Sequence, residues 1–145
     1  MIIRDILTVK KVGVLYSVSP EQTISEAVAM MVQSDIGSLV VHRDGFMVGL
    51  LSERDVLRGL NQLGANVLQM KVNTLMIGEP IIGSPDDTVD YVRGVMTENH
   101  ISHLPVMDGD NLLGIISFHD VARSCLNQAD FENSLLKRYI KHWPE

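Results

Sequence analysis

One segment of the chain occurs twice. Residues 19–60 align with residues 84–125 without a gap at an offset of 65, and 12 of the 42 aligned positions are identical. The identical pairs are Ser19/Ser84, Pro20/Pro85, Thr23/Thr88, Met31/Met96, Ile36/Ile101, Leu39/Leu104, Val41/Val106, Gly49/Gly114, Ser52/Ser117, Asp55/Asp120, Val56/Val121 and Arg58/Arg123. A fixed offset between similar segments indicates a duplicated structural unit. We therefore expect two repeats, residues 1–64 and 65–128, and an extension over residues 129–145.

Both repeats predict the same opening elements. A short apolar strand, residues 14–18 or 80–83, ends in a Ser-Pro turn signal. A helix follows, with Thr23 or Thr88 as its N-cap and apolar residues at helical spacing behind it.

A hairpin and a second helix complete each repeat. In the first copy two apolar runs, residues 38–42 and 46–51, are joined through Asp-Gly, which is a strong hairpin signal. The corresponding runs of the second copy are residues 103–107 and 112–116. The order strand, helix, strand, strand, helix predicts a mixed α/β fold with α+β character. Two three-stranded sheets would pack face to face about a pseudo-twofold axis, with a cleft on each side of it.

The extension predicts one more helix over residues 129–142. Its apolar residues Phe131, Leu135, Leu136 and Tyr139 recur every three or four positions. This helix either folds back on its own lobe or packs on another subunit, and the sequence leaves both open.

The most informative repeated motif is glycine, two apolar residues, then Ser-x-x-Asp, in residues 49–55 and 114–120. A purely structural interpretation is a capping box, in which serine and aspartate satisfy the first amides of a helix. A functional interpretation uses the same geometry, because such amides attract phosphate and a carboxylate can accept hydrogen bonds from both hydroxyls of a ribose. Gly49 and Gly114 would allow close backbone approach, and Arg54, with His119 as its counterpart, would face phosphates.

With both motifs in this strand order, the chain resembles a tandem pair of CBS domains (cystathionine β-synthase domains) over nearly all of residues 1–127. The resemblance implies that Asp55 and Asp120 bind ribose hydroxyls, and that Ser52 and Ser117 lie near phosphates. The family's Ile-x-x-Leu-Pro-Val segment is present at residues 101–106.

The same segment contains further residues that we expect to belong to the site. Pro105 and His103 lie in it, and His103 is expected to be a pocket-lining or a hydrogen-bonded surface residue. Val40 replaces the usual proline in the first copy.

The resemblance further implies a regulatory module without catalytic activity. It would bind an adenosyl ligand, such as AMP, ADP, ATP, NAD or S-adenosylmethionine, in the clefts between the repeats. Ligand binding would then change the shape or assembly of a homodimer, and an unidentified regulated protein would respond. The alternative is a ligand-free dimeric scaffold or protein-docking module.

The two halves of the chain differ in charge. Residues 1–72 hold seven Lys or Arg and seven Asp or Glu, whereas residues 73–145 hold five and eleven. An anionic nucleotide is therefore expected to prefer the first site, with Asp55 and Arg54, over the second, with Asp120 and His119. Lys10 and its neighbour Lys11 either add positive charge to a nearby phosphate or are ordinary solvated lysines.

Composition argues against several other classes. A net charge of −6 and a pI near 5.3 disfavour nucleic acid as a partner. A single cysteine, Cys125, predicts a reducing, cytoplasmic location, and no signal peptide or apolar run of membrane-spanning length is found.

Catalysis and metal binding find no support in the residues. No set of nucleophile, base and oxyanion donors and no phosphate-binding glycine loop is present, so no enzymatic activity is expected. His100 and His103 straddle a predicted helix-to-strand junction without further ligands at suitable spacing, so neither a metal nor a cofactor is expected.

Overall fold

The computed structural model describes residues 1–10 and 15–139. The elements are α1 (Ile3–Lys10), β1 (Ser17–Val18), α2 (Ile24–Ser34), β2 (Ser38–Arg43), β3 (Phe46–Ser52), α3 (Glu53–Leu63), the 3-10 turns η1 (Ala65–Gln69) and η2 (Val72–Thr74), α4 (Val89–Glu98), β4 (His103–Asp108), β5 (Asn111–Ser117) and α5 (Phe118–Tyr139). Three segments named above, Lys11, Val14 and residues 140–145, lie outside the described residues.

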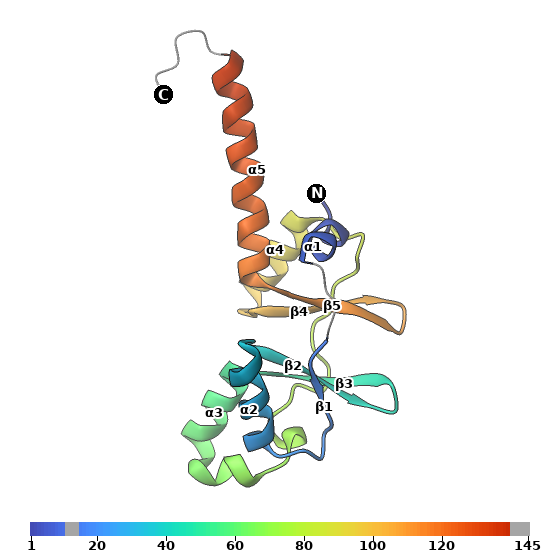
Figure 1. The fold of residues 1–145 in the computed structure, drawn as a ribbon, viewed down its shortest axis with the longest axis vertical. Coiled ribbons are helices and arrows are strands. Elements are labelled where there is room, and N and C mark those ends of the chain that lie inside the picture. The colour runs from blue at the N-terminus through green and yellow to red at the C-terminus, as the bar shows by residue number, and fades with distance from the viewer. Residues whose placement is uncertain (11–14, 140–145) are drawn as a thin grey trace.

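Two lobes are stacked with their sheets facing each other, as predicted (Figure 1). In the first lobe β1 runs parallel to β2, and β2 is antiparallel to β3. In the second lobe β4 and β5 form the equivalent antiparallel hairpin. The turn between β2 and β3 contains Asp44 and Gly45, both with positive φ (53° and 83°), which explains the Asp-Gly pair in the sequence.

The predicted third strand of the second sheet is wrong. Residues 80–83 form no strand, and only Gly83 pairs with the sheet, through a parallel bridge to Val106. Pro80 has no N–H to donate to a ladder, and Ile81 and Ile82 are exposed rather than packed on a core. The second sheet therefore has two strands and one bridged residue.

Each lobe has its own hydrophobic core, built from the faces that the helical spacing predicted. Ile24, Ala27 and Met31 of α2 are buried in the first core, and Val89, Val92 and Met96 of α4 are buried in the second. Both helices begin at the expected cap, since the hydroxyls of Thr23 and Thr88 each accept a hydrogen bond of 3.1 Å from a backbone amide three residues on.

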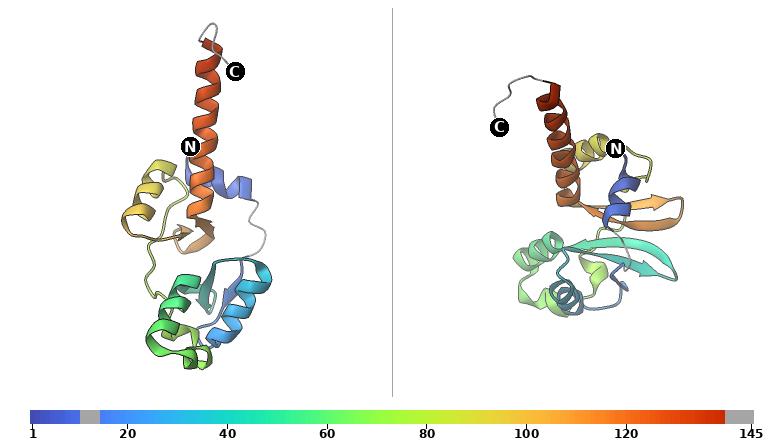
Figure 2. Two further views of the ribbon diagram at one scale, coloured as in Figure 1. Left: turned by 90° about the vertical axis from the view of Figure 1, so that its left-hand side faces the viewer. Right: turned by 45° about the horizontal axis from the view of Figure 1, so that its top comes forward.

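The segment that opens each repeat packs on the other repeat's core. Ile3 and Ile6 of α1 are buried in the second lobe, and Val72 of η2 is buried in the first. The backbone contacts repeat as well, because Ile3 N donates to Asp87 O (2.9 Å) just as Val72 N donates to Gln22 O (2.7 Å). This reciprocal exchange links the lobes and carries α1 to the second of them (Figure 2).

The C-terminal part is one continuous helix, not two. α5 runs unbroken from Phe118 to Tyr139 and extends away from the second lobe (Figure 1). No glycine or proline interrupts it, so nothing ends the repeat's last helix near residue 128. Phe131 and Leu136 are exposed (64% and 58%), so the described part of the extension does not fold back on its own lobe. Among the described residues, no helix is long and apolar enough to cross a membrane.

Candidate functional site

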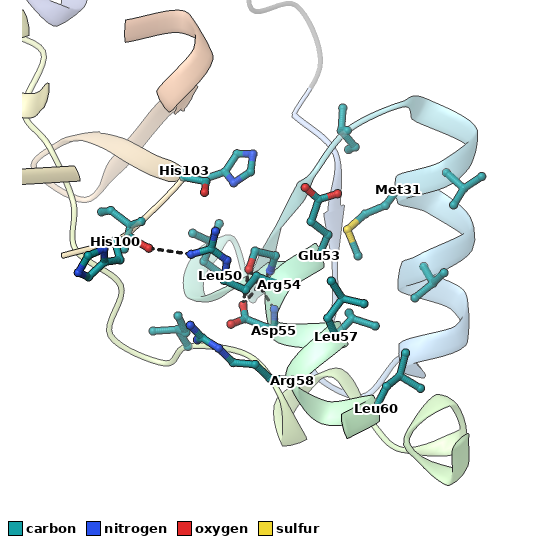
Figure 3. A pocket seen from close by; sticks show the side chains of 18 of the residues that line it. Met31, Leu50, Glu53, Arg54, Asp55, Leu57, Arg58, Leu60, His100 and His103 are labelled. Carbon is teal, nitrogen blue, oxygen red and sulfur yellow. Dashed lines mark hydrogen bonds between the residues drawn. The ribbon is translucent and has the colours of Figure 1, made fainter. Parts of the chain in front are cut away.

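A cleft of about 1070 Å³ opens between the lobes at the first repeat's motif. Its walls come from the first turn of α3, from an apolar face of α2 and from residues 99–103 of the second lobe (Figure 3). Its lining combines apolar side chains such as Met31 and Leu60 with charged groups such as those of Arg54 and Asp55. This combination of an apolar wall and a few convergent polar groups is typical of small-molecule sites.

Asp55 both caps α3 and presents a carboxylate to the cleft. Its Oδ2 accepts hydrogen bonds from the Ser52 backbone N–H and from the Ser52 hydroxyl, each at 2.9 Å, and the Asp55 amide donates to Ser52 Oγ at 3.3 Å. In the part of the chain that the structure describes, the other oxygen, Oδ1, accepts no hydrogen bond. The capping box is therefore real, and it leaves one carboxylate oxygen for a ligand, so the structural and functional interpretations are compatible.

Arg54 joins the lobes across this cleft. Its Nη1 donates to the backbone oxygen of His100 at 3.2 Å, and Figure 3 shows the guanidinium pointing toward that segment. Because Arg54 is exposed and a guanidinium has five N–H donors, most of its donor capacity is available to an anion.

His103 belongs to the first cleft, although it lies in the second repeat. Its ring packs over Gly37, where an added Cβ would lie 3.1 Å from His103 Cε1 and 3.3 Å from Glu53 Oε1. Its Nδ1 is buried and has no hydrogen-bond partner within the described residues. Burial lowers the pKa of His103 below 6.5; nearby Lys10 lowers it further, while Glu53 and Asp120 oppose the shift.

The predicted site residues on the strands lie inside the sheets. Val40 and Pro105 are buried in β2 and β4, opposite Leu50 and Ile115, and neither Val40 nor Gly49 lines the cleft. Gly49 does permit a close approach, but the atoms that approach it belong to this chain and not to a ligand.

A Cβ on Gly49 would lie 2.7 Å from Met76 Sδ and 2.9 Å from Ile77 O. Gly114 occupies the matching buried position in β5, opposite Val106.

The second motif repeats the cap and adds an ion pair. Asp120 Oδ2 accepts from Ser117 N at 2.9 Å, and the Asp120 amide donates to Ser117 Oγ at 3.0 Å. Lys10 Nζ lies 2.8 Å from the same Oδ2 and donates to Ile115 O at 2.9 Å. Partial burial of Asp120 opposes its ionisation, but the hydrogen bonds from Lys10 and Ser117 outweigh it and lower its pKa below 3.8.

The remaining predicted residue, His119, contacts Arg123, the second-copy member of the last identical pair of the repeat. Its Nε2 lies 2.7 Å from Arg123 Nη2. The structure thus brings Ser52, Arg54, Asp55 and His103 together at one cleft, and Ser117, His119 and Asp120 together at the other motif.

Sequence reasoning missed several contributors. Glu53 and Asp35 line the first cleft. Lys10 was named as a possible charge near a phosphate, but its position at the second motif, reached from a segment assigned to the first repeat, was missed. Glu53 could have been found, because it lies inside the motif, whereas the position of Lys10 depends on the exchange of α1 between lobes. Within the described ranges, no group of three or more His, Cys, Asp or Glu gathers to hold a metal.

Comparison with known proteins agrees with this architecture. A family model described as CBS domain matches residues 3–62 and 72–127. The CBS domain-containing protein YhcV of Bacillus subtilis is 32% identical over 118 residues, which cover 81% of each chain. The solved CBS-domain containing protein ATU1752 from Agrobacterium tumefaciens has a TM-score of 0.81 at 30% identity, covering 86% of this chain and 98% of that chain.

A third comparison concerns the fold alone. The solved CBS domain pair of protein MJ0100, in complex with 5′-methylthioadenosine and S-adenosyl-L-methionine, has a TM-score of 0.76 at 23% identity and covers 88% of this chain and 98% of that chain. The family model matches both repeats, and the solved structures share the fold that the repeats form. The chain is a pair of CBS domains and belongs to the CBS-domain family.

Proposed function

We propose that this CBS pair is a sensor that binds an adenosyl nucleotide at the Asp55 cleft. The observation that carries the proposal is that the free oxygen of Asp55, the guanidinium of Arg54 and a wall from the other lobe border one cavity. The carboxylate would hold the ribose hydroxyls, Arg54 would face the phosphates, and the apolar wall would cover the base.

The family also supports the proposed class of ligand. CBS pairs are regulatory ligand-binding modules, and the MJ0100 pair was solved with two adenosyl compounds. Nothing in this cleft resembles a catalytic set, so binding rather than turnover is its proposed role.

The output would be a change in how the lobes pack or how chains assemble. A ligand in the cleft touches both lobes, so it shifts their arrangement by the difference between its affinities for the two states. We further propose that two chains form an isologous homodimer through α2 and α3, where Val32 and Leu57 are exposed (74% and 65%) and line the same cleft, so that the interface would border the ligand. A regulated protein in the cytoplasm would respond to this change.

A panel of ligands tests the proposal directly. Thermal unfolding of the purified chain is followed with AMP, ADP, ATP, NAD and S-adenosylmethionine, with GMP as the control, because a ligand that binds only the native state raises its stability. We expect a dose-dependent rise with at least one adenosyl ligand and none with GMP. No rise with any of them at millimolar concentration would favour the ligand-free scaffold or docking module, for which the exposed face of α5 is the candidate surface.

A further inference from the structure

The groups around the second motif are more positive than those around the first. This is the reverse of the two halves of the chain, of which the second half is the more negative. At the first cleft, three carboxylates (Asp35, Glu53, Asp55) accompany two guanidinium groups (Arg54, Arg58). At the second motif, Asp120 is paired with Lys10, and Arg123 lies against His119. Phe118 stands where the first copy has Glu53, so one carboxylate is missing there. Lys10 was counted with the first half, yet its charge acts at the second site.

Lys10 is held so that it can still serve a ligand. An ammonium group has three N–H donors, and two are used, on Asp120 Oδ2 and Ile115 O. In the described part of the chain, the third has no acceptor. The Lys10 side chain is 40% exposed and that of Asp120 is 16% exposed, so the ammonium can be reached from solvent. One hydrogen bond of Lys10 goes to Asp120 Oδ2 and the other to the backbone oxygen of Ile115, so Asp120 Oδ1 is left for ribose hydroxyls.

We propose that the Asp120 site is selective for adenosyl ligands that carry an anionic phosphate, and that Lys10 determines this selectivity. This inference rests on the proposed function. Lys10 neutralises Asp120, so a phosphate entering there meets a cation rather than an uncompensated carboxylate. At the Asp55 cleft the two guanidinium groups of Arg54 and Arg58 are outnumbered by three carboxylates, so we expect this cleft to discriminate less in favour of phosphate.

The affinities for AMP and for uncharged adenosine distinguish two roles of Lys10, recognition of the phosphate and support of Asp120. The Asp55→Asn variant leaves the second site as the one to be titrated by calorimetry, and Lys10→Gln is then added to it. We expect Lys10→Gln to weaken AMP about tenfold and adenosine by less than about twofold, and Lys10→Arg to restore the preference for AMP. Arg4→Gln is the matched control, because Arg4 lies on the same helix and is paired with Asp86, away from the motif.

Three results would contradict the inference and leave the proposed function standing. AMP and adenosine could weaken equally in Lys10→Gln, which would make Lys10 a support for Asp120 only. AMP could bind the wild type and Asp120→Asn but not Asp55→Asn. The Asp55→Asn variant could bind adenosine as tightly as AMP. If no adenosyl compound binds any variant or the wild type, the proposed function itself fails.

Discussion

Lys10 Nζ lies 2.8 Å from Asp120 Oδ2, so an ion pair joins the last residue of α1 to the first turn of α5. The two residues are far apart in sequence, and α1 reaches this position only because it packs on the second lobe's core. The pair therefore fixes the exchanged helix to the motif that caps α5. A ligand that touches Asp120 would therefore also act on α1.

A double-mutant cycle should detect this pair. Lys10→Met and Asp120→Asn are made singly and together, and urea unfolding gives the coupling free energy. Because both side chains are partly exposed, we expect about 0.2–1 kcal/mol at pH 7. The pKa of Asp120 is lowered, so this contribution is present above pH 3.8 and is lost as the pH falls through the lower folded-state pKa. A coupling of zero at pH 7 would mean that the pair adds nothing to stability.

Asp55→Ala should abolish binding of the adenosyl ligand at the first cleft and also destabilise the fold. The loss of the cap costs about 1 kcal/mol, as in other capping boxes, and the loss of the carboxylate removes the acceptor for ribose hydroxyls. Thr23→Ala is the matched control, because it removes the cap of α2 without touching the cleft lining. Thr23→Ala should lower stability by a similar amount and leave calorimetric affinity unchanged. Equal loss of binding in both variants would make the effect one of stability alone.

Gly49→Ala should destabilise the protein by about 1–3 kcal/mol. The new methyl group would lie 2.9 Å from Ile77 O, a backbone atom that is held by its hydrogen bonds to Leu50. Gly78→Ala is the control, because a Cβ there meets nothing within 4 Å. Chemical denaturation of both variants measures the difference. Equal stability of the two would show that the segment between the lobes yields easily.

Some of these features could be predicted from the sequence alone. Helix caps and hairpin turns, such as Thr23 and Asp44-Gly45, could be predicted because a few adjacent residues determine them. The capping box at Ser52 was visible for the same reason. The continuous α5 could have been predicted too, since no glycine or proline separates the two proposed helices.

The position of α1 could not be predicted in the same way. Ile3 and Ile6 carry an ordinary amphipathic spacing, and nothing local indicates which lobe they cover. The placement of Lys10 beside Asp120 and of His103 over Gly37 follows from that packing and from the stacking of the lobes. Residues that cross between repeats were therefore not placed at the correct site, whereas residues within one motif were found, with the exception of Glu53.

Acid should weaken the fold through His103. Its pKa in the folded state lies below the ordinary 6.5, chiefly because the ring is buried, so the unfolded chain binds the proton more readily. Stability is thus complete above pH 6.5 and falls as the pH drops below it. Urea unfolding at pH 7.5 and 5.5 should show a smaller difference for His103→Gln than for the wild type. The exposed His42→Gln is the control, and a difference that shrinks equally in both variants would remove His103 as the cause.

Leu57→Glu should convert the proposed homodimer to a monomer, whereas Leu136→Glu should leave it dimeric. Leu57 lies on α3 with 65% of its surface exposed and lines the cleft together with the apolar face of α2. A charge there would have to be desolvated in an isologous interface, twice per dimer. Leu136 is similarly exposed (58%) but lies on the part of α5 that extends beyond the lobe, and so supplies a matched leucine outside the proposed interface. Light scattering coupled to size exclusion measures the masses, and the reverse pattern would place the dimer contact on α5 instead.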